Sequence, residues 1–135
     1  MKIKLIDFGY EKAPERAHYN DCGADVYLNR DYYVNPHQTI RIPLGFGLEL
    51  PDGLAAFIFP RSGWSSKGIS CELPPIDSGY KGEVHAIVTN HTSETQRFRK
   101  GERIGQLVIL PYIAADFVSE TGAERGSDAF GSTGR

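Results

Sequence analysis

The chain has 135 residues, of which 40% are hydrophobic, and a formal net charge of -2. This length fits one domain with a genuine core, and the small negative charge argues against long nucleic acid as a partner. The longest apolar stretch, LVILPYIAA, is too short to span a bilayer, and the first residues lack the apolar block of a signal peptide. We therefore expect a cytoplasmic protein that binds neither membranes nor long nucleic acid.

Short strand patterns recur along the chain. Alternating or apolar segments occur in KIKLIDF, TIRIPLGFGLEL, LAAFIF, GEVHAIVTN and RIGQLVIL, with turn formers between them. Only SGWSSKG, after Arg61, fits a short helix, with Ser62 as its cap and Gly68 at its end. The pattern predicts an all-β sandwich or barrel.

Two polar motifs lie in the first half of the chain. In DCGADVY, Asp25 stands just before a strand, where a carboxylate is commonly a turn former. In PRSG, Arg61, Ser62 and Gly63 directly follow an apolar strand. An arginine fork, a hydroxyl and accessible backbone N–H groups suit phosphate oxygens. An ordinary turn with an exposed arginine explains an isolated tripeptide at least as well.

Two further motifs follow. PPIDSGYKGEV predicts a hairpin with a buried Ile76 and with Asp77 at its tip. Asp77 could act as a base for water and Tyr80 could lay its ring against a flat or sugar-like ligand, although an ordinary turn would use the same residues. In GERIGQLVIL, Gln106 falls inside an apolar strand, where its amide needs a partner. Gln106 either ties down a neighbouring backbone or meets a ligand.

The last residues, RGSDAFGSTGR, differ in composition from the rest of the chain. They are too rich in glycine and serine to fill a core, yet they include Arg125 and Phe130. We expect residues 1–124 to form the domain and residues 125–135 a mobile tail. A segment that orders only over a ligand needs one aromatic ring, one phosphate-matching arginine and small donors.

Together, CGADVY, PRSG, IDSGYKGEV, GERIGQLVI and RGSDAFGSTG resemble the ordered motifs of the trimeric deoxyuridine triphosphatase family, the dUTPases or dUTP diphosphatases. The match runs from about residue 22 to the last residue. It implies a distorted jelly-roll-like β-barrel that assembles as a homotrimer and hydrolyses dUTP to dUMP and diphosphate with Mg²⁺. It also implies shared active sites, which the tail of one subunit covers on a neighbour.

The resemblance assigns a role to each motif. Asp77 would activate the water that attacks the α-phosphorus, Tyr80 would support deoxyribose and exclude ribose, and Asp25 would approach Mg²⁺ through water. The other implied substrate contacts are Arg61, Ser62, Gly63 and Gln106 to the phosphates, the backbone of Pro75, Ile76 and Asp77 to uracil, and Arg125, Phe130, Gly131, Ser132 and Thr133 from the tail.

The chain departs from the family pattern at four positions. Cys71 stands where the family commonly has an asparagine that contacts the base, and Pro74 stands where it has a glycine. Backbone reading of uracil remains possible without that asparagine. Asp128 and Ala129 replace a glycine pair, which predicts weaker closure or an altered tail geometry.

Two other functions are compatible with parts of the sequence. The homologous dCTP deaminase group shares the IDSGY turn, but it needs a catalytic glutamate where Ile87 stands, and isoleucine cannot transfer protons. A non-catalytic β-barrel that binds nucleotide or a protein partner as a switch would not need the carboxylate of Asp77.

Overall fold

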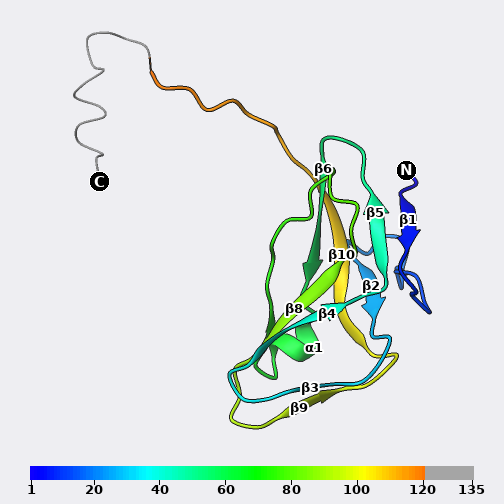
Figure 1. Ribbon diagram of the computed structural model, residues 1–135, viewed down its shortest axis with the longest axis vertical. Coiled ribbons are helices and arrows are strands. Elements are labelled where there is room, and N and C mark those ends of the chain that lie inside the picture. The colour runs from blue at the N-terminus through cyan, green and yellow to red at the C-terminus, as the bar shows by residue number, and fades with distance from the viewer. Residues whose placement is uncertain (121–135) are drawn as a thin grey trace.

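The computed structural model describes residues 1–120 and has a β-rich body with an extended arm at the end of the described chain (Figure 1). Its strands and single helical turn are β1 (Lys4–Asp7), β2 (Ala24–Tyr27), β3 (Tyr32–Val34), β4 (Thr39–Pro43), β5 (Phe46–Glu49), β6 (Leu54–Phe59), α1 (Ser62–Ser65), β7 (Ile69–Cys71), β8 (His85–Asn90), β9 (Gln96–Phe98) and β10 (Arg103–Pro111). The predicted all-β class is confirmed. TIRIPLGFGLEL forms two strands because Gly45, with a φ of 83°, turns the chain between them.

The strands form four small antiparallel sheets, ordered β1-β5, β2-β10-β6, β3-β9 and β4-β8-β7. In Figure 1 the long β10 runs through the body between β2 and β6, and it pairs with both strands. The sheets of the described chain do not join into one closed cylinder, which agrees with the distorted barrel expected from the sequence.

The core lies under the inner faces of these sheets. In β8, buried and half-buried residues alternate, so Ala86 and Val88 face inward while His85 and Ile87 face outward. Asn90 is the single buried polar residue of the described chain, and its amide donates to the carbonyls of Val34 and Glu94 at 2.9 and 2.7 Å. Its hydrogen bonds offset the cost of burying the amide.

The helical turn α1 follows β6. Its N-cap is Arg61, which is extended and makes no side-chain capping bond, so the predicted capping by Ser62 is wrong. Ser62 lies one position too far along, because it is already the first helical residue. The predicted end at Gly68 is also wrong for α1, which ends at Ser65 with Ser66 as its C-cap. Gly68, with a φ of 91°, ends the turn that follows, just before β7. Within residues 1–120, no helix is long or apolar enough to cross a membrane.

The predicted hairpin exists, but its arms separate. Strands β7 and β8 pair from Ile69↔Asn90 to Cys71↔Val88, and the Glu72 N–H still donates to the Ile87 carbonyl at 2.8 Å. The chain then leaves β8, and Ile76 forms a bridge with Ala56 of β6 instead. Ile76 is half-buried rather than buried.

After Pro111 the chain runs away from the body (Figure 1). Large apolar side chains on this arm are exposed, with Ile113 at 90%, Phe117 at 97% and Val118 at 85%. Exposed apolar side chains at this density are typical of protein–protein contact sites.

Candidate active site

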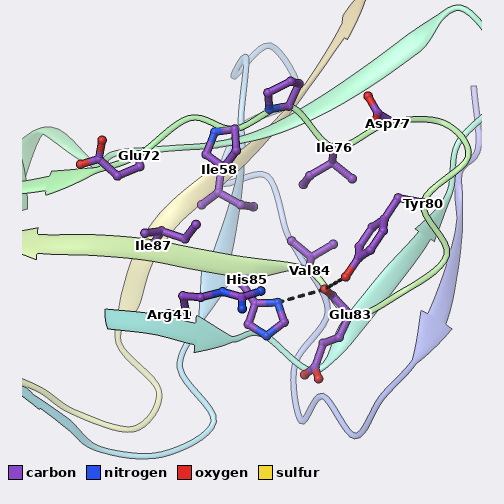
Figure 2. Close-up of a pocket in the computed structure, with 12 residues that line it drawn as sticks. Arg41, Ile58, Glu72, Ile76, Asp77, Tyr80, Glu83, Val84, His85 and Ile87 are labelled. Carbon is purple, nitrogen blue, oxygen red and sulfur yellow. Dashed lines mark hydrogen bonds between the residues drawn. The ribbon is translucent and has the colours of Figure 1, made fainter. Parts of the chain in front are cut away.

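A pocket of about 250 Å³ opens where the β7–β8 loop separates from β8 (Figure 2). Ile58, Val84 and Ile87 give it apolar walls. Asp77 and Tyr80 lie at one end and Arg41 lies toward the other (Figure 2). A compact apolar pocket with a few polar groups at its edges fits a small planar ligand.

Asp77 places a free carboxylate at the edge of this pocket. The side chain is exposed and has no hydrogen bond or ion pair with the described residues. Its backbone carbonyl accepts from the Tyr80 N–H at 3.0 Å, which fixes the turn. The carboxylate is therefore free to contact water or a ligand.

The Tyr80 ring is fixed beside Asp77. Its hydroxyl donates to the Glu83 carbonyl at 2.7 Å (Figure 2). A Cβ atom on Gly82 would lie 2.6 Å from that hydroxyl oxygen, so the ring occupies the space that a side chain at 82 would need. The ring thus forms a rigid wall of the pocket.

The separation of the arms leaves backbone groups of β8 without a partner strand. The N–H and carbonyl of Ile76 exchange hydrogen bonds with Ala56 at 2.8 and 3.0 Å, which commits them to β6. On the other edge of β8, the Leu44 N–H donates to the Val84 carbonyl at 2.9 Å. Bonding direction alternates along an antiparallel strand, so the N–H and carbonyl of His85 point toward the gap.

His85 was not among the residues predicted from the sequence. Its backbone is open only because residues 74–76 cross to β6, a contact between segments about 20 residues apart that local patterns do not encode. The one local signal is the position of His85, which starts the strand within GEVHAIVTN and follows a proline-rich arm that cannot donate backbone hydrogen bonds at Pro74 and Pro75.

Cys71 does not reach the pocket. Its side chain is 9% exposed and its thiol donates to the Ile58 carbonyl at 3.3 Å. Burial raises the pKa of this thiol from 9.0 to about 11, so it stays protonated at neutral pH. Both Cys71 and Cys22 are free thiols.

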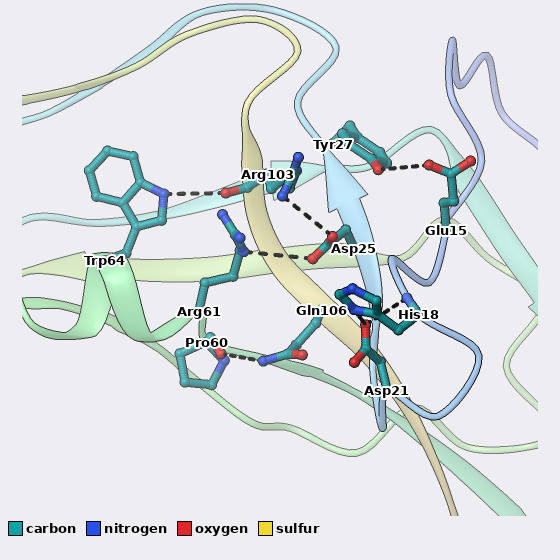
Figure 3. Close-up of polar contacts among 10 residues, drawn as sticks. All are labelled: Glu15, His18, Asp21, Asp25, Tyr27, Pro60, Arg61, Trp64, Arg103 and Gln106. Atoms are coloured by element: carbon teal, nitrogen blue, oxygen red, sulfur yellow. Dashed lines mark hydrogen bonds and ion pairs between the residues drawn. The ribbon is translucent and has the colours of Figure 1, made fainter.

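A second polar cluster lies on β2, β10 and the start of α1 (Figure 3). The Asp25 side chain is 16% exposed, and its oxygens lie 3.6 Å from Arg61 Nε and 3.9 Å from a terminal nitrogen of Arg103. Gln106, paired with Asp25 across the strands, donates from Nε2 to the Pro60 carbonyl at 3.0 Å. Gln106 therefore ties down the backbone just before Arg61, which was one of its two predicted roles.

This cluster borders a hollow of about 360 Å³ with a basic lining. Arg61, Gly63, Lys67 and Arg103 line it, together with Trp64. Ser62 and Gly63 are exposed, and no atom lies within 4 Å of a Cβ placed on Gly63. Arginine forks, an ammonium and open backbone suit phosphate oxygens. Lys67 and Arg103 were not predicted from the motifs.

The two sites are separate on one chain. The residues that line the pocket are all different from those that line the basic hollow. Ile76, beside Asp77, pairs with Ala56, whereas Arg61 follows five residues later. At about 3.3 Å per residue, the backbones of Ala56 and Arg61 are roughly 16 Å apart. The predicted tail residues Arg125, Phe130, Gly131, Ser132 and Thr133 lie outside the described residues.

The acidic groups fit a metal only as secondary ligands. Among the described residues, no group of three histidine, cysteine or carboxylate side chains could hold an ion by itself. Asp25 is a carboxylate of the kind Mg²⁺ prefers, and its contacts to the arginines are longer than close hydrogen bonds. It can therefore hold a water of an ion that is bound mainly by the phosphates of a ligand.

Comparison with known proteins gives consistent results. The sequence profile of the dUTPase family matches residues 10–134. A deoxyuridine 5'-triphosphate nucleotidohydrolase of Clostridium tetani is 38% identical over 100% of this chain and 97% of its own length. Another from Tropheryma whipplei is 40% identical over 97% of this chain and 93% of its own length.

Solved structures have the same fold. A dUTPase from phage phi11 of S. aureus, in a structure that describes a structural Mg(II) ion, superposes with a TM-score of 0.83 at 22% identity, over 92% of this chain and 99% of its own. A dUTPase of Staphylococcus bacteriophage 80alpha with dUpNHpp gives a TM-score of 0.81 at 26% identity, over 99% of both chains.

Proposed function

Because this chain belongs to the dUTPase family, we propose that it hydrolyses dUTP to dUMP and diphosphate. The observation that carries the proposal is the free Asp77 carboxylate beside the Tyr80 ring, at the edge of a pocket sized for a small planar ligand. A nucleotide with its base in the pocket would bring its sugar to Tyr80 and its α-phosphate to Asp77.

The uracil ring binds to the open backbone edge of β8. The His85 carbonyl accepts a hydrogen bond from the uracil N3–H, and the His85 N–H donates to an adjacent base carbonyl. The Tyr80 ring packs against deoxyribose and leaves no room for a 2′-hydroxyl. Pro75, Ile76 and Asp77 enclose the base from the opposite arm.

Asp77 then orients one water and takes its proton. The water oxygen attacks the α-phosphorus, the bond from that phosphorus to the bridging oxygen breaks, and diphosphate leaves. Arg61, Ser62, Gly63, Lys67 and Arg103 stabilise the charge that develops on the leaving oxygens. Gln106 fixes the backbone that presents Arg61.

Mg²⁺, when bound through the triphosphate and an Asp25-held water, would neutralise phosphate charge. The related phage structure with a structural Mg(II) ion supports use of this metal. The two free cysteines support a reducing, cytoplasmic location.

We propose that the enzyme is a homotrimer with shared active sites. On one chain, Arg61 lies roughly 16 Å along the backbone from Ala56, the bridge partner of Ile76 beside Asp77, so a second subunit is the better source of the arginine that meets the triphosphate at Asp77. The exposed apolar arm that includes Ile113, Phe117 and Val118 gives each subunit a means of contacting its neighbour.

The domain would comprise residues 1–124, and the tail of residues 125–135 would close over the occupied site. There Arg125 would bind the γ-phosphate, Phe130 would stack on uracil, and Gly131, Ser132 and Thr133 would contact phosphate oxygens. Removal of residues 125–135 should lower turnover steeply and leave thermal unfolding of the body unchanged.

Diphosphate release from dUTP, UTP, dTTP and dCTP, with and without Mg²⁺, tests the activity. We expect release from dUTP with Mg²⁺, and we expect Asp77→Asn to bind dUTP while its kcat falls by about a hundredfold or more. Full activity in Asp77→Asn would contradict the mechanism.

The same assays distinguish the two alternative functions. Ammonia release from dCTP would favour the deaminase alternative, against which the aliphatic Ile87 in the pocket argues. Nucleotide binding without hydrolysis would favour the regulatory alternative.

A further inference from the structure

We propose that Arg41 reads the base and favours uracil over cytosine. This inference rests on the proposed function, because it concerns the pocket in which dUTP would bind. Uracil presents two carbonyl oxygens that flank one N–H, so a complete complement needs two donors and one acceptor. The open backbone of His85 supplies one donor and one acceptor. The second donor must come from another residue that lines the pocket.

Most donors around the pocket are already committed. The Tyr80 hydroxyl donates to the Glu83 carbonyl at 2.7 Å, and the buried Cys71 thiol donates to the Ile58 carbonyl at 3.3 Å. The Ile76 N–H is bonded to Ala56, and Pro74 and Pro75 have no N–H.

The remaining side chains offer few free donors. Nδ1 of His85 lies 3.1 Å from the Glu83 carbonyl, which can only accept, so this nitrogen is committed as a donor. Glu72 and Glu83 are acceptors, and one oxygen of each already accepts from Ser70 and Gly45, respectively. Arg41 has no hydrogen bond or ion pair with residues 1–120, so all its donors are free.

Arg41 is placed to meet the far edge of a bound base. It lies on β4 directly opposite Ile87 of β8, and both residues line the pocket. Neighbouring strands are about 4.8 Å apart, so a long arginine side chain can cross β8 toward the gap. Figure 2 shows the Arg41 side chain beside His85, away from Asp77. Its donors would face the O4 oxygen of uracil, where cytosine instead has an amino group that cannot accept.

The inference is tested by the ratio of two affinities. Direct binding of dUMP and of dCMP, which carry the same phosphate, should be measured by titration calorimetry for the wild-type full chain and for Arg41→Met, Arg41→Lys and Arg99→Met. Arg99 is an exposed arginine that lines neither site, so it is the matched control. Thermal unfolding of each variant checks folding.

We expect Arg41→Met to weaken dUMP binding by about tenfold to a hundredfold and to leave dCMP binding unchanged or stronger. Arg41→Lys, which keeps donors, should keep part of the preference, and Arg99→Met should keep all of it. An equal loss for both nucleotides would show that Arg41 acts on phosphate and would overturn the proposal, as would an unchanged ratio. Because the measurement is binding, it stays decisive even if the protein does not hydrolyse dUTP.

Discussion

Asp25 illustrates how far a single residue can be predicted. Its carboxylate was expected from the motif to hold a water of Mg²⁺, but in the structure both oxygens also face arginines that line the basic hollow. The arginine contacts could not be predicted, because β10 has an irregular register between Arg103 and Gly105 that sequence patterns do not specify. We infer that Asp25 positions Arg61 and Arg103 as well.

Asp25→Asn should raise KM for dUTP by about fivefold, equal to about 1 kcal/mol for a partly exposed ion pair. The reason is that both arginines lose the charge that holds them toward the phosphates. KM and kcat should be measured over a series of Mg²⁺ concentrations. Recovery at high Mg²⁺ would indicate a role through the metal alone. Asp31→Asn, which breaks the pair with Arg97 outside both sites, is the control and should leave KM unchanged.

Cys71 predicts a pH dependence of stability. Its pKa is raised from 9.0 to about 11 in the folded protein, so its contribution is complete below pH 9 and is lost as the pH rises through 11. The loss amounts to about 3 kcal/mol at most. The free energy of unfolding, measured from pH 8 to 11, should fall less in Cys71→Ala than in Cys22→Ala, whose exposed thiol is the control. Parallel curves would contradict this assignment.

At the scale of elements, local sequence patterns predicted the strands and turns better than they predicted the contacts between distant segments. The alternation in β8 and the apolar run of β6 identify those strands, and IDSGYKG identifies the turn. The crossing of Ile76 to Ala56 was missed because it pairs distant segments through an isolated bridge. That crossing creates the pocket, so Asp77 and Tyr80 were predictable from the sequence, while the open backbone of His85 and the shape of the pocket were not.

Gly82→Ala should relax the exclusion of ribose. The added Cβ would lie 2.6 Å from the Tyr80 hydroxyl oxygen and 2.7 Å from the adjoining ring carbon, so the ring must shift from the sugar site. We expect the ratio of kcat/KM for dUTP to that for UTP to fall by about tenfold or more. Gly79→Ala is the matched control in the same turn, since no atom lies within 4 Å of its added Cβ. An equal ratio in both variants would exclude a steric role for the ring.

At the scale of the whole molecule, the candidate groups lie at two separate places on the chain. The free carboxylate of Asp77 lies at the pocket, and the cationic side chains lie at the hollow. The motifs indicated Asp77 and Arg61 but not Lys67 or Arg103, and the distribution of these groups over two places follows from the fold. The sequence therefore predicts the chemistry of the site better than its assembly.

Mixing two inactive variants tests the shared site. Asp77→Asn and Arg61→Gln should each be almost inactive, but equal amounts that are unfolded and refolded together should recover about a quarter of wild-type activity, because random assembly pairs an intact Asp77 with an intact Arg61 in that share of sites. Diphosphate release from dUTP measures the recovery. A mixture no more active than its components would show that each site belongs to one chain.

The unpaired edge at His85 has a consequence for the empty enzyme. Beyond Cys71, the residues of β8 before Val88 have no register partner in β7, and a nucleobase that bonds to the His85 backbone would take the place of a strand residue and extend the ladder. Ligand and sheet would then stabilise each other. The His85 amide should exchange its hydrogen with solvent quickly in the free protein and slowly once dUMP is bound.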